Sequence, residues 1–183
     1  FFLLTVTAFA GGGWVKGKGF GYYKLSQAWV SSDGYFSGAD GYSPGLNSLL
    51  MTTSFYTEHG LGKGTSLEAY LPLYVRHSVE GTILEDSIGL SVNDDARGLG
   101  DIDIGLRFQL YSGQLFNLSG TVKLGLPTGG TLKGERENLF TGDGEFNQLI
   151  RMDASVPFGT KKVGGFANAY LGFNNRNEPF VAE

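Results

Sequence analysis

The sequence predicts an all-β chain, an antiparallel up-and-down transmembrane β-barrel of which about seven meander strands are present. Three observations predict this fold. Apolar and polar residues alternate along runs of about ten residues, the connections are alternately long and short, and no segment has the ~20 apolar residues of a transmembrane helix. Successive side chains of a strand point to opposite faces, so every run has one apolar and one polar face.

The clearest alternation runs from Leu99 to Leu126, on either side of a short turn at 112–114. Polar residues, including Asp103, Arg107 and Lys123, occupy the positions between the apolar ones along the whole length. The apolar members are Ile102, Ile104, Leu106, Phe108, Leu110, Phe116, Leu118, Val122, Leu124 and Leu126. The stretch therefore predicts a hairpin with one oily face.

Five further runs show the same alternation, at 21–30, 48–58, 65–76, 144–158 and 165–175. Pro72 interrupts the third run and predicts a bulge or kink, because proline lacks the N–H that a ladder needs. The connections 31–47, 77–98 and 127–142 are long, and 59–64, 112–114 and 159–164 are short. Strict alternation predicts short periplasmic turns and long extracellular loops, whereas a soluble sandwich has no reason to gather every long loop at one end.

Composition restricts the partners and the chemistry. The 183 residues carry a net charge of -4 without a basic run, so the sequence predicts no binding of nucleic acid. The absence of cysteine excludes a disulfide scaffold, a thiolate metal site and a cysteine nucleophile. Thirty glycines and 25 aromatic residues (14 Phe, 9 Tyr, 2 Trp) suit a barrel with aromatic girdles, although an aromatic-rich soluble β-protein would have a similar composition.

The first ten residues, 1–10, read as the end of a secretory signal peptide that closes in the small-x-small site Ala8-Phe9-Ala10. The alternative is an ordinary first strand. Residues 11–20 are rich in Gly and Lys and are expected to form a flexible lead-in. Residues 21–183 are expected to be a partial outer-membrane barrel, with C-terminal strands missing because bacterial barrels have even strand numbers.

The alternation assigns side chains to a lipid face and a lumen face. Charges at lipid-facing positions cost about 2–4 kcal/mol for Arg or Lys at the bilayer midplane, so the charged face is placed inward. The predicted lipid-facing residues are Leu67, Leu71, Leu73, Ile102, Ile104, Leu106, Phe108, Leu118, Val122, Leu124, Ile150 and Met152. The predicted lumen-lining residues are Lys24, Glu58, Glu68, Arg76, Asp101, Asp103, Arg107, Lys123, Glu145, Arg151 and Asp153.

The lumen charges admit two interpretations. They form ladders that hold a narrow barrel together, or they line an aqueous path and set its selectivity. Their mixed signs argue against a strong preference for anions or cations. Asp101, Asp103, Arg107 and Lys123 lie on adjacent predicted strands and are expected to share one network.

Signals for catalysis and for cofactors are weak. The only two histidines, His59 and His77, are expected at opposite ends of their hairpin, which disfavours a two-histidine metal site. A hydrolase would need a histidine beside a serine on a strand; His77 and Ser78 are adjacent in sequence, but alternation points their side chains apart. The acidic residues Glu85, Asp86, Asp94 and Asp95 suit either Ca²⁺ or, more commonly, a solvated loop. We expect no enzyme activity, no cofactor and no resident metal.

Four segments resemble Gram-negative outer-membrane β-barrels: GLGDIDIGLRF (98–108), VKLGLPTG (122–129), TGDGEFNQ (141–148) and YLGFNNR (170–176). Together with GKGFGYYKLSQAWV (17–30), they are most similar to the "meta-pathway of phenol degradation" transporter-like proteins and related Bacteroidetes barrels. The resemblance implies an outer-membrane location and the passage of small, hydrophobic or aromatic compounds. It brings no catalytic residues.

The function expected from the sequence is thus a passive channel or transporter-like barrel in the outer membrane of a Gram-negative bacterium. Its expected partners are outer-membrane lipid and a small-molecule solute. Two alternatives stay open, a structural or adhesive barrel with a plugged lumen and a secreted carbohydrate-binding β-sandwich.

Overall fold

The computed structural model describes residues 12–37, 41–85, 88–135, 139–159 and 164–177. These residues form eight strands: β1 (Gly21–Ser37), β2 (Gly41–Gly62), β3 (Thr65–Glu85), β4 (Ile88–Gly98), β5 (Ile102–Ser112), β6 (Asn117–Leu126), β7 (Phe146–Gly159) and β8 (Gly164–Asn177). No helix capable of crossing a membrane occurs among them. The predicted signal segment, residues 1–10, lies outside the described residues.

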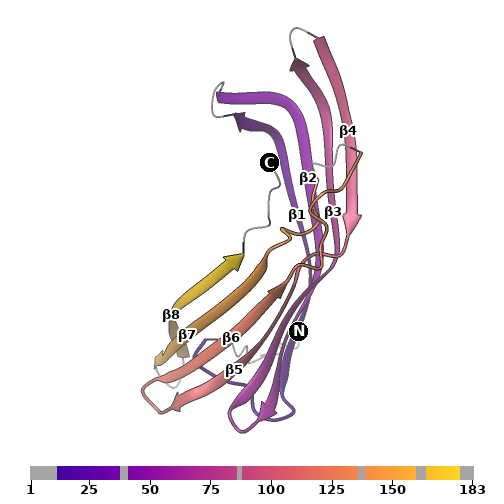
Figure 1. Cartoon of the computed structure of the whole chain (residues 1–183). Coiled ribbons are helices and arrows are strands. Elements are labelled where there is room, and N and C mark those ends of the chain that lie inside the picture. The colour runs from indigo at the N-terminus through magenta and orange to yellow at the C-terminus, as the bar shows by residue number, and fades with distance from the viewer. Residues whose placement is uncertain (1–11, 38–40, 86–87, 136–138, 160–163, 178–183) are drawn as a thin grey trace, which may run out of the picture.

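The strands form a single antiparallel meander that curls into half of a barrel (Figure 1). β4 and β5 lie end to end along β3, because β4 pairs with Val75–Glu85 and β5 with Thr65–Tyr70. Across the break, Gly100 N donates a 3.0 Å hydrogen bond to Pro72 O. The sheet therefore has seven strand positions across its width, and the predicted all-β antiparallel meander is confirmed.

The register separates the side chains as the alternation predicts. On the concave side, Arg107 lies between Ser66 of β3 and Thr121 of β6. On the convex side, its neighbour Leu106 lies between Leu67 and Val122. Arg107 is 3% exposed and Leu106 is 39% exposed, so the polar face is the buried one and the apolar face the open one.

A β-bulge at Leu73 divides the sheet into a lower and an upper part. Thr53 of β2 lies opposite Tyr74, whereas the next residue, Ser54, lies opposite Pro72, which leaves Leu73 as the extra residue. This confirms the irregularity predicted from Pro72. A bulge exchanges the two faces of its own strand for the residues beyond it. On β3, the polar residues at 76, 78 and 80 therefore lie on the convex side.

The prediction that Arg76 lines the lumen is wrong for this reason. Arg76 lies opposite Met51 of β2 and Arg97 of β4, on the convex face. Its concave-facing neighbour is Val75, which is 5% exposed. Strict alternation counted through Leu73 without a bulge assigns Arg76 to the concave face.

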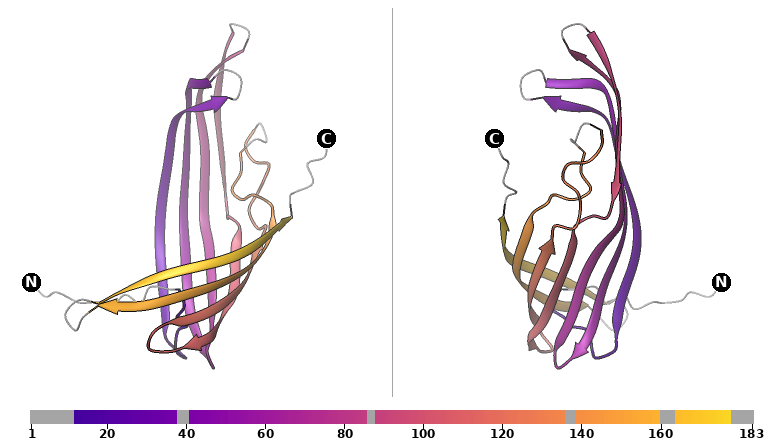
Figure 2. Two further views of the ribbon diagram at one scale, coloured as in Figure 1. Left: turned by 90° about the vertical axis from the view of Figure 1, so that its left-hand side faces the viewer. Right: turned by 45° about the vertical axis from the view of Figure 1, so that its right-hand side comes forward.

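Two of the three expected long loops are strands. β1 and β2 extend over most of 31–47, and β3 and β4 over most of 77–98. The two hairpins rise beyond the other strands (Figure 2). Serine, glycine and acidic residues predict loops there, but the β3–β4 hairpin buries Val92 and Ala96, at 4% and 2% exposure, on one face and carries polar residues on the other, as an antiparallel pair can.

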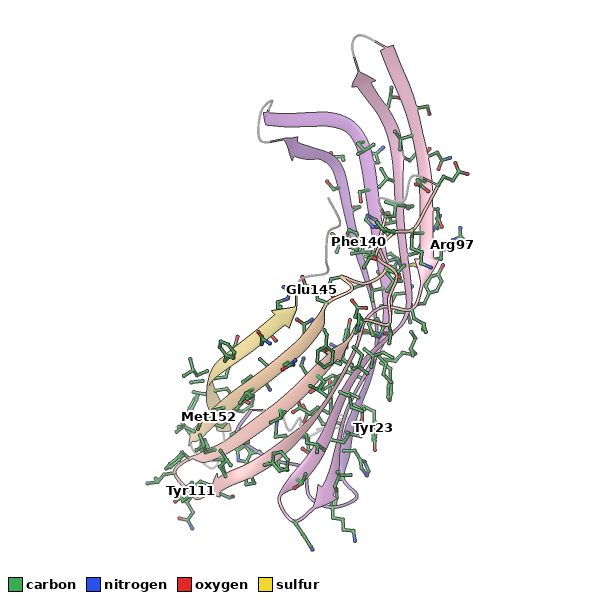
Figure 3. All side chains as sticks on the ribbon, viewed as in Figure 1. Tyr23, Arg97, Tyr111, Phe140, Glu145 and Met152 are labelled. Atoms are coloured by element: carbon green, nitrogen blue, oxygen red, sulfur yellow. The ribbon has the colours of Figure 1, made fainter. Side chains whose placement is uncertain are left out.

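The third expected loop is confirmed and covers the upper concave surface. Residues 127–135 and 139–145 belong to no strand and contain one isolated bridge, Lys133–Leu139. Leu139 is 2% exposed, and the ring of Phe140 lies 4.7 Å from His77 in an edge-on contact. Figure 3 shows Phe140 beside the upper strands, with Arg97 on the other side of the sheet.

A second bulge at Leu110 shifts the lower end of β5. The register moves between Gln109 and Tyr111, so Tyr111 joins the convex face opposite Leu118 rather than the expected polar face. Its ring stacks on Phe116 with centroids 4.6 Å apart. The bulge thereby adds an aromatic pair at the lower rim of the apolar surface.

Deleting Leu73 tests the role of the upper bulge. Without it, either Arg76 and its polar neighbours enter the concave face or the lower pairing slips by one residue, and we expect a clear loss of thermal stability. The measurement is the midpoint of unfolding by circular dichroism. Leu73→Ala, which keeps the extra residue, is the matched control and should shift the midpoint little. Equal midpoints for the two variants would contradict this role.

Candidate functional site

The candidate site is the concave face of the lower sheet, where polar side chains of β2, β3, β5, β6 and β7 face one another. Several are almost fully buried although the sheet is one layer thick: Glu58, Glu68, Arg107, Ser119, Thr121, Asp153 and Ser155 are 0–6% exposed. Buried polar groups cost free energy unless they are paired. The pairing of these groups therefore determines what this face can hold.

The central pair joins Glu68 of β3 to Arg107 of β5, with 2.5 Å between Oε1 and Nη2. Both side chains are at most 7% exposed. Arg107 also lies 3.4 Å from Thr121 Oγ1 through Nε. Because neither charge reaches water freely, each depends on the other for compensation.

Two further charged groups flank this pair. On β2, Glu58 accepts a 2.7 Å hydrogen bond from Tyr56 Oη and forms an ion pair with Lys16 at 3.7 Å. On β7, Arg151 donates a 2.9 Å hydrogen bond from Nε to Asp153. Charged side chains thus lie on β2, β3, β5 and β7, and the two carboxylates Glu58 and Glu68 stand directly opposite each other on β2 and β3.

Higher on the same face, the charges are less covered and border open space. Lys123 Nζ lies 2.6 Å from Asp103 Oδ2, and the two side chains are 28% and 29% exposed. Two cavities, of about 100 and 230 Å³, share these two residues in their linings. Arg151 and Tyr56 close the smaller cavity, and Arg176 lines the larger one. This part of the face can hold water or a small polar molecule.

The upper rim is fixed by carboxylates at the base of the long loop. Asp101 accepts hydrogen bonds from Gly129 N at 2.7 Å and Asp143 N at 2.6 Å. Arg176 of β8 pairs with Glu145 and, at 2.8 Å, with Asp143. These groups tie residues 127–145 to the sheet ends rather than lining the middle of the concave face.

A segment before β1, which we call the strap (residues 12–16), crosses the lower concave face. The carbonyl oxygen of Gly12 accepts hydrogen bonds from Arg107 and Ser119, both at 3.1 Å. Gly13 N donates to Ser155 Oγ at 2.6 Å. The strap lies within the lead-in 11–20 and is held by side chains from three strands.

The side-chain amide of Gln109 continues this binding. Its Nε2 donates to Gly13 O at 2.8 Å, and its Oε1 accepts from Val15 N at 3.0 Å. One glutamine thus pairs with the strap backbone as a neighbouring strand would. The Trp14 ring meets Phe166 of β8 edge-on, with centroids 5.8 Å apart.

Most predicted site residues lie on the expected face. The concave face carries Lys24, Glu58, Glu68, Asp103, Arg107, Lys123, Arg151 and Asp153. The convex face carries Leu67, Leu71, Ile102, Ile104, Leu106, Phe108, Leu118, Val122, Leu124, Ile150 and Met152. Leu73, predicted to face lipid, is the unpaired residue of the bulge and is 49% exposed.

The predicted shared network is divided in the structure. Lys123 pairs with Asp103 as expected, but Arg107 pairs with Glu68, and Asp101 binds the loop. The sequence does not predict that Gln109, Ser119 and Ser155 bind the strap. Their alternating inward positions were visible in the pattern, but nothing local in the sequence indicates that a segment from before β1 binds them.

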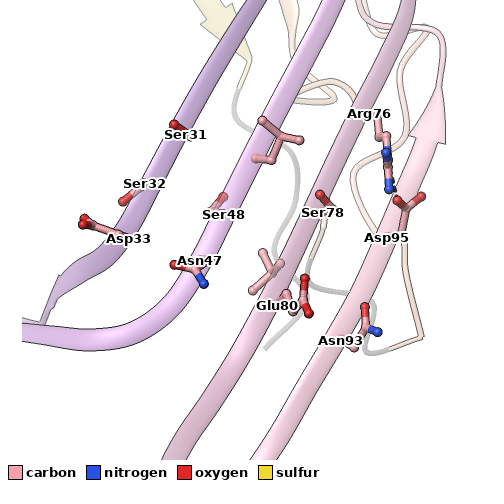
Figure 4. Close-up of a pocket in the computed structure, with 12 residues that line it drawn as sticks. Ser31, Ser32, Asp33, Asn47, Ser48, Arg76, Ser78, Glu80, Asn93 and Asp95 are labelled. Atoms are coloured by element: carbon pink, nitrogen blue, oxygen red, sulfur yellow. Dashed lines mark hydrogen bonds and ion pairs between the residues drawn. The ribbon is translucent and has the colours of Figure 1, made fainter.

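Above the Leu73 bulge, a polar groove of about 730 Å³ opens on the convex side (Figure 4). Arg76 Nε and Arg97 Nε donate to Asp95 at 2.6 and 2.5 Å. The hydrogen bond from Arg97, supported by that from Arg76, holds the pKa of the Asp95 carboxyl below its usual range. This groove is rich in serine and asparagine.

The two histidines lie in different parts of the sheet, and Ser48 Oγ of β2 lies 3.5 Å from His77 Nε2. His59 Nδ1 lies 2.6 Å from Tyr23 Oη near the lower turn, and His77 lies on the upper concave face against Phe140. No group of three or more His, Cys, Asp or Glu side chains suited to a metal is found in the part of the chain that the structure describes. No protein-family model, curated protein or solved structure matches the chain.

Removing one partner of the central pair should be costly. We expect Arg107→Met to reduce the free energy of unfolding by about 3–5 kcal/mol, because it leaves Glu68 charged, buried and unpaired. Urea unfolding followed by tryptophan fluorescence measures the change. Lys123→Met removes a partly exposed pair and should cost about 1 kcal/mol or less.

The double variant Arg107→Met/Glu68→Leu separates charge burial from packing. It should regain most of the loss, because no unpaired charge remains. A loss for Arg107→Met no larger than that for Lys123→Met would contradict the assigned role of the central pair.

The groove makes a prediction on pH. The lowered pKa of Asp95 means that its ion pairs stabilise the β3–β4 hairpin above the ordinary aspartate value of about 3.9, and that this stabilisation is lost as pH falls through the lower, folded value. Arg97→Gln should raise the Asp95 pKa, measured by NMR titration of its carboxyl carbon. Arg176→Gln, a control at the opposite side of the sheet, should leave it unchanged; equal shifts would contradict the assignment.

Proposed function

We propose that the chain is part of an outer-membrane β-barrel of a Gram-negative bacterium whose lumen passes small solutes. One observation carries this proposal: the charged face of the sheet is buried and the apolar face is exposed, which is the opposite of a soluble protein. The charged concave face is buried, while large apolar side chains of β5–β8 stand exposed on the convex face, as with Leu171 at 80% and Phe173 at 71%. In water such an apolar surface would promote aggregation, whereas in a bilayer it would face the lipid chains.

The position of the Leu73 bulge supports the same interpretation. Below it the convex face is apolar, and above it the same face carries Arg76, Ser78 and Asp95. A lipid bilayer requires an apolar band of limited height, flanked by polar surface. The exchange of faces at Leu73 thus gives one wall of the barrel both an apolar band and a polar extension into water.

The lumen chemistry favours small polar or amphipathic solutes. Asp103 and Lys123, with opposite charges, border both cavities on the concave face. Such a lining discriminates weakly between anions and cations. The passage of hydrophobic or aromatic compounds has only the family resemblance in its favour.

A plugged structural or adhesive barrel is the second candidate, and a specific observation favours it. The strap and the buried ion pairs fill much of the lower concave face. A carbohydrate-binding sandwich has less support, because the described residues form one sheet rather than two packed sheets.

The test of membrane insertion uses two matched arginine substitutions. Leu106→Arg on the convex band should cost about 2–4 kcal/mol in lipid vesicles, whereas Ser78→Arg, on the same face above the bulge, should cost about 0–1 kcal/mol. Urea unfolding from lipid vesicles gives both values. Similar costs at the two sites would contradict the assignment of the band.

Conductance tests whether small solutes pass through the lumen. The full chain, purified from the outer-membrane fraction, should migrate differently on a gel before and after boiling and should conduct in planar lipid bilayers. A heat-shifted protein without conductance would favour the plugged barrel. A soluble protein without a heat shift would overturn the barrel.

A further inference from the structure

We propose that the concave face of β5–β7 is a binding site for an extended, glycine-containing peptide backbone, and that the strap occupies it as a removable plug of the lumen. The binding site follows from the contacts alone. The role as a plug rests on the proposed function as a barrel with a lumen. The two parts can therefore fail separately.

The hydrogen bonds named here address the backbone of the strap, while its side chains add the Trp14–Phe166 ring contact and the Lys16–Glu58 ion pair. Arg107 and Ser119 donate to the carbonyl oxygen of Gly12, Ser155 accepts from Gly13 N, and Gln109 both donates and accepts. These groups come from β5, β6 and β7, so the site exists only when the sheet is curled. Ser119 and Ser155 are both 0% exposed with the strap in place.

Glycine is required at two positions. Gly12 has a φ of +101°, in the region that other residues rarely adopt. A Cβ atom on Gly13 would overlap the carbonyl oxygen of Asn117 and lie 2.9 Å from Ser155 N. The site therefore selects a peptide whose backbone can approach the sheet without a side chain between them.

The strap is held differently from the strands around it. Its contacts to the sheet are mainly side chain to backbone, whereas the strands pair by continuous ladders. Segments held by fewer hydrogen bonds open at lower free energy than ladder-paired strands. The strap can thus leave while the barrel stays folded, and its departure would uncover the face beside Asp103 and Lys123.

Thiol labelling tests the site, since the chain has no cysteine of its own. Ser119→Cys places a thiol beneath the strap, and Asn174→Cys, on the exposed part of the same face, is the control. With a water-soluble maleimide and the full chain in lipid vesicles, the thiol at position 119 should react at least about tenfold more slowly than the thiol at position 174, because it reacts only when the strap opens. Equal rates would overturn the site.

Adding Gly13→Leu should displace the strap and accelerate labelling at position 119 by about tenfold, without a change at position 174. Gly17→Leu is the matched control in the same segment, because a Cβ there meets only the Phe20 ring at 3.4 Å. The heat shift on a gel shows that each variant is folded. No acceleration by Gly13→Leu in a folded barrel would overturn the proposal.

A synthetic peptide of residues 12–17, GGWVKG, provides a second measurement. Added to the Gly13→Leu variant, it should slow the labelling at position 119 again, whereas GLWVKG should not. Protection by neither peptide or by both equally would overturn selection for glycine.

Conductance then separates the two parts of the proposal. Gly13→Leu should raise the conductance of the barrel, and the GGWVKG peptide should lower it. Accelerated labelling with unchanged conductance would overturn the plug and keep the binding site. The expected labelling behaviour with no conductance in any variant would overturn the proposed channel and keep the binding site.

Discussion

The alternation of side chains across a single layer of β-sheet is the constraint on which the structure depends. One sheet has two faces, and with no second sheet behind it neither face can be a shared hydrophobic core. The chain assigns its apolar residues to the convex face and its ions to the concave one. Leu106 and Arg107 are adjacent in sequence and separated by the sheet, with 39% and 3% of their surfaces exposed.

The charged groups buried on the concave face need ion-pair or hydrogen-bond partners, and this requirement determines the contacts around them. Glu68 and Arg107 satisfy each other, and the remaining donors of Arg107 reach Thr121 and the strap. A strap rich in apolar side chains could not fill these positions, because the groups beneath it need hydrogen-bond partners. A backbone with two glycines supplies carbonyl and N–H groups in the space available.

The sequence predicts the fold well because period-two alternation reports the local environment of each strand. It places eight of the eleven predicted lumen charges on the concave face, and it finds the irregularity at Pro72. The prediction fails where a bulge changes the face to which the later residues of a strand point. Counting through Leu73 misassigns Arg76, since a bulge inverts every later position and cannot be assigned to one residue from composition. Composition predicts loops where the upper hairpins lie, because serine, glycine and acidic residues are common in turns although they do not prevent ladder pairing.

The site itself was less predictable, for a topological reason. Arg107, Ser119 and Ser155 are spread over three strands, and the strap lies about 95 residues or more before them in the chain. Local patterns give the face on which a residue lies but not which distant segment reaches it. The strand pairing determines the neighbours of Arg107, so Glu68 rather than Asp101 becomes its partner.

The Leu73 bulge and the strap together suggest how one sheet can serve two environments. The bulge lets β3 present leucine on the convex face below it and arginine on the same face above it, with one register shift against β2. The strap lets the buried ions keep a partner without a permanent second sheet. Because ladder bonds are continuous and strap bonds are few, the element most easily released is the one that covers the polar face. A barrel wall built this way can stay rigid while the access to its charged interior changes.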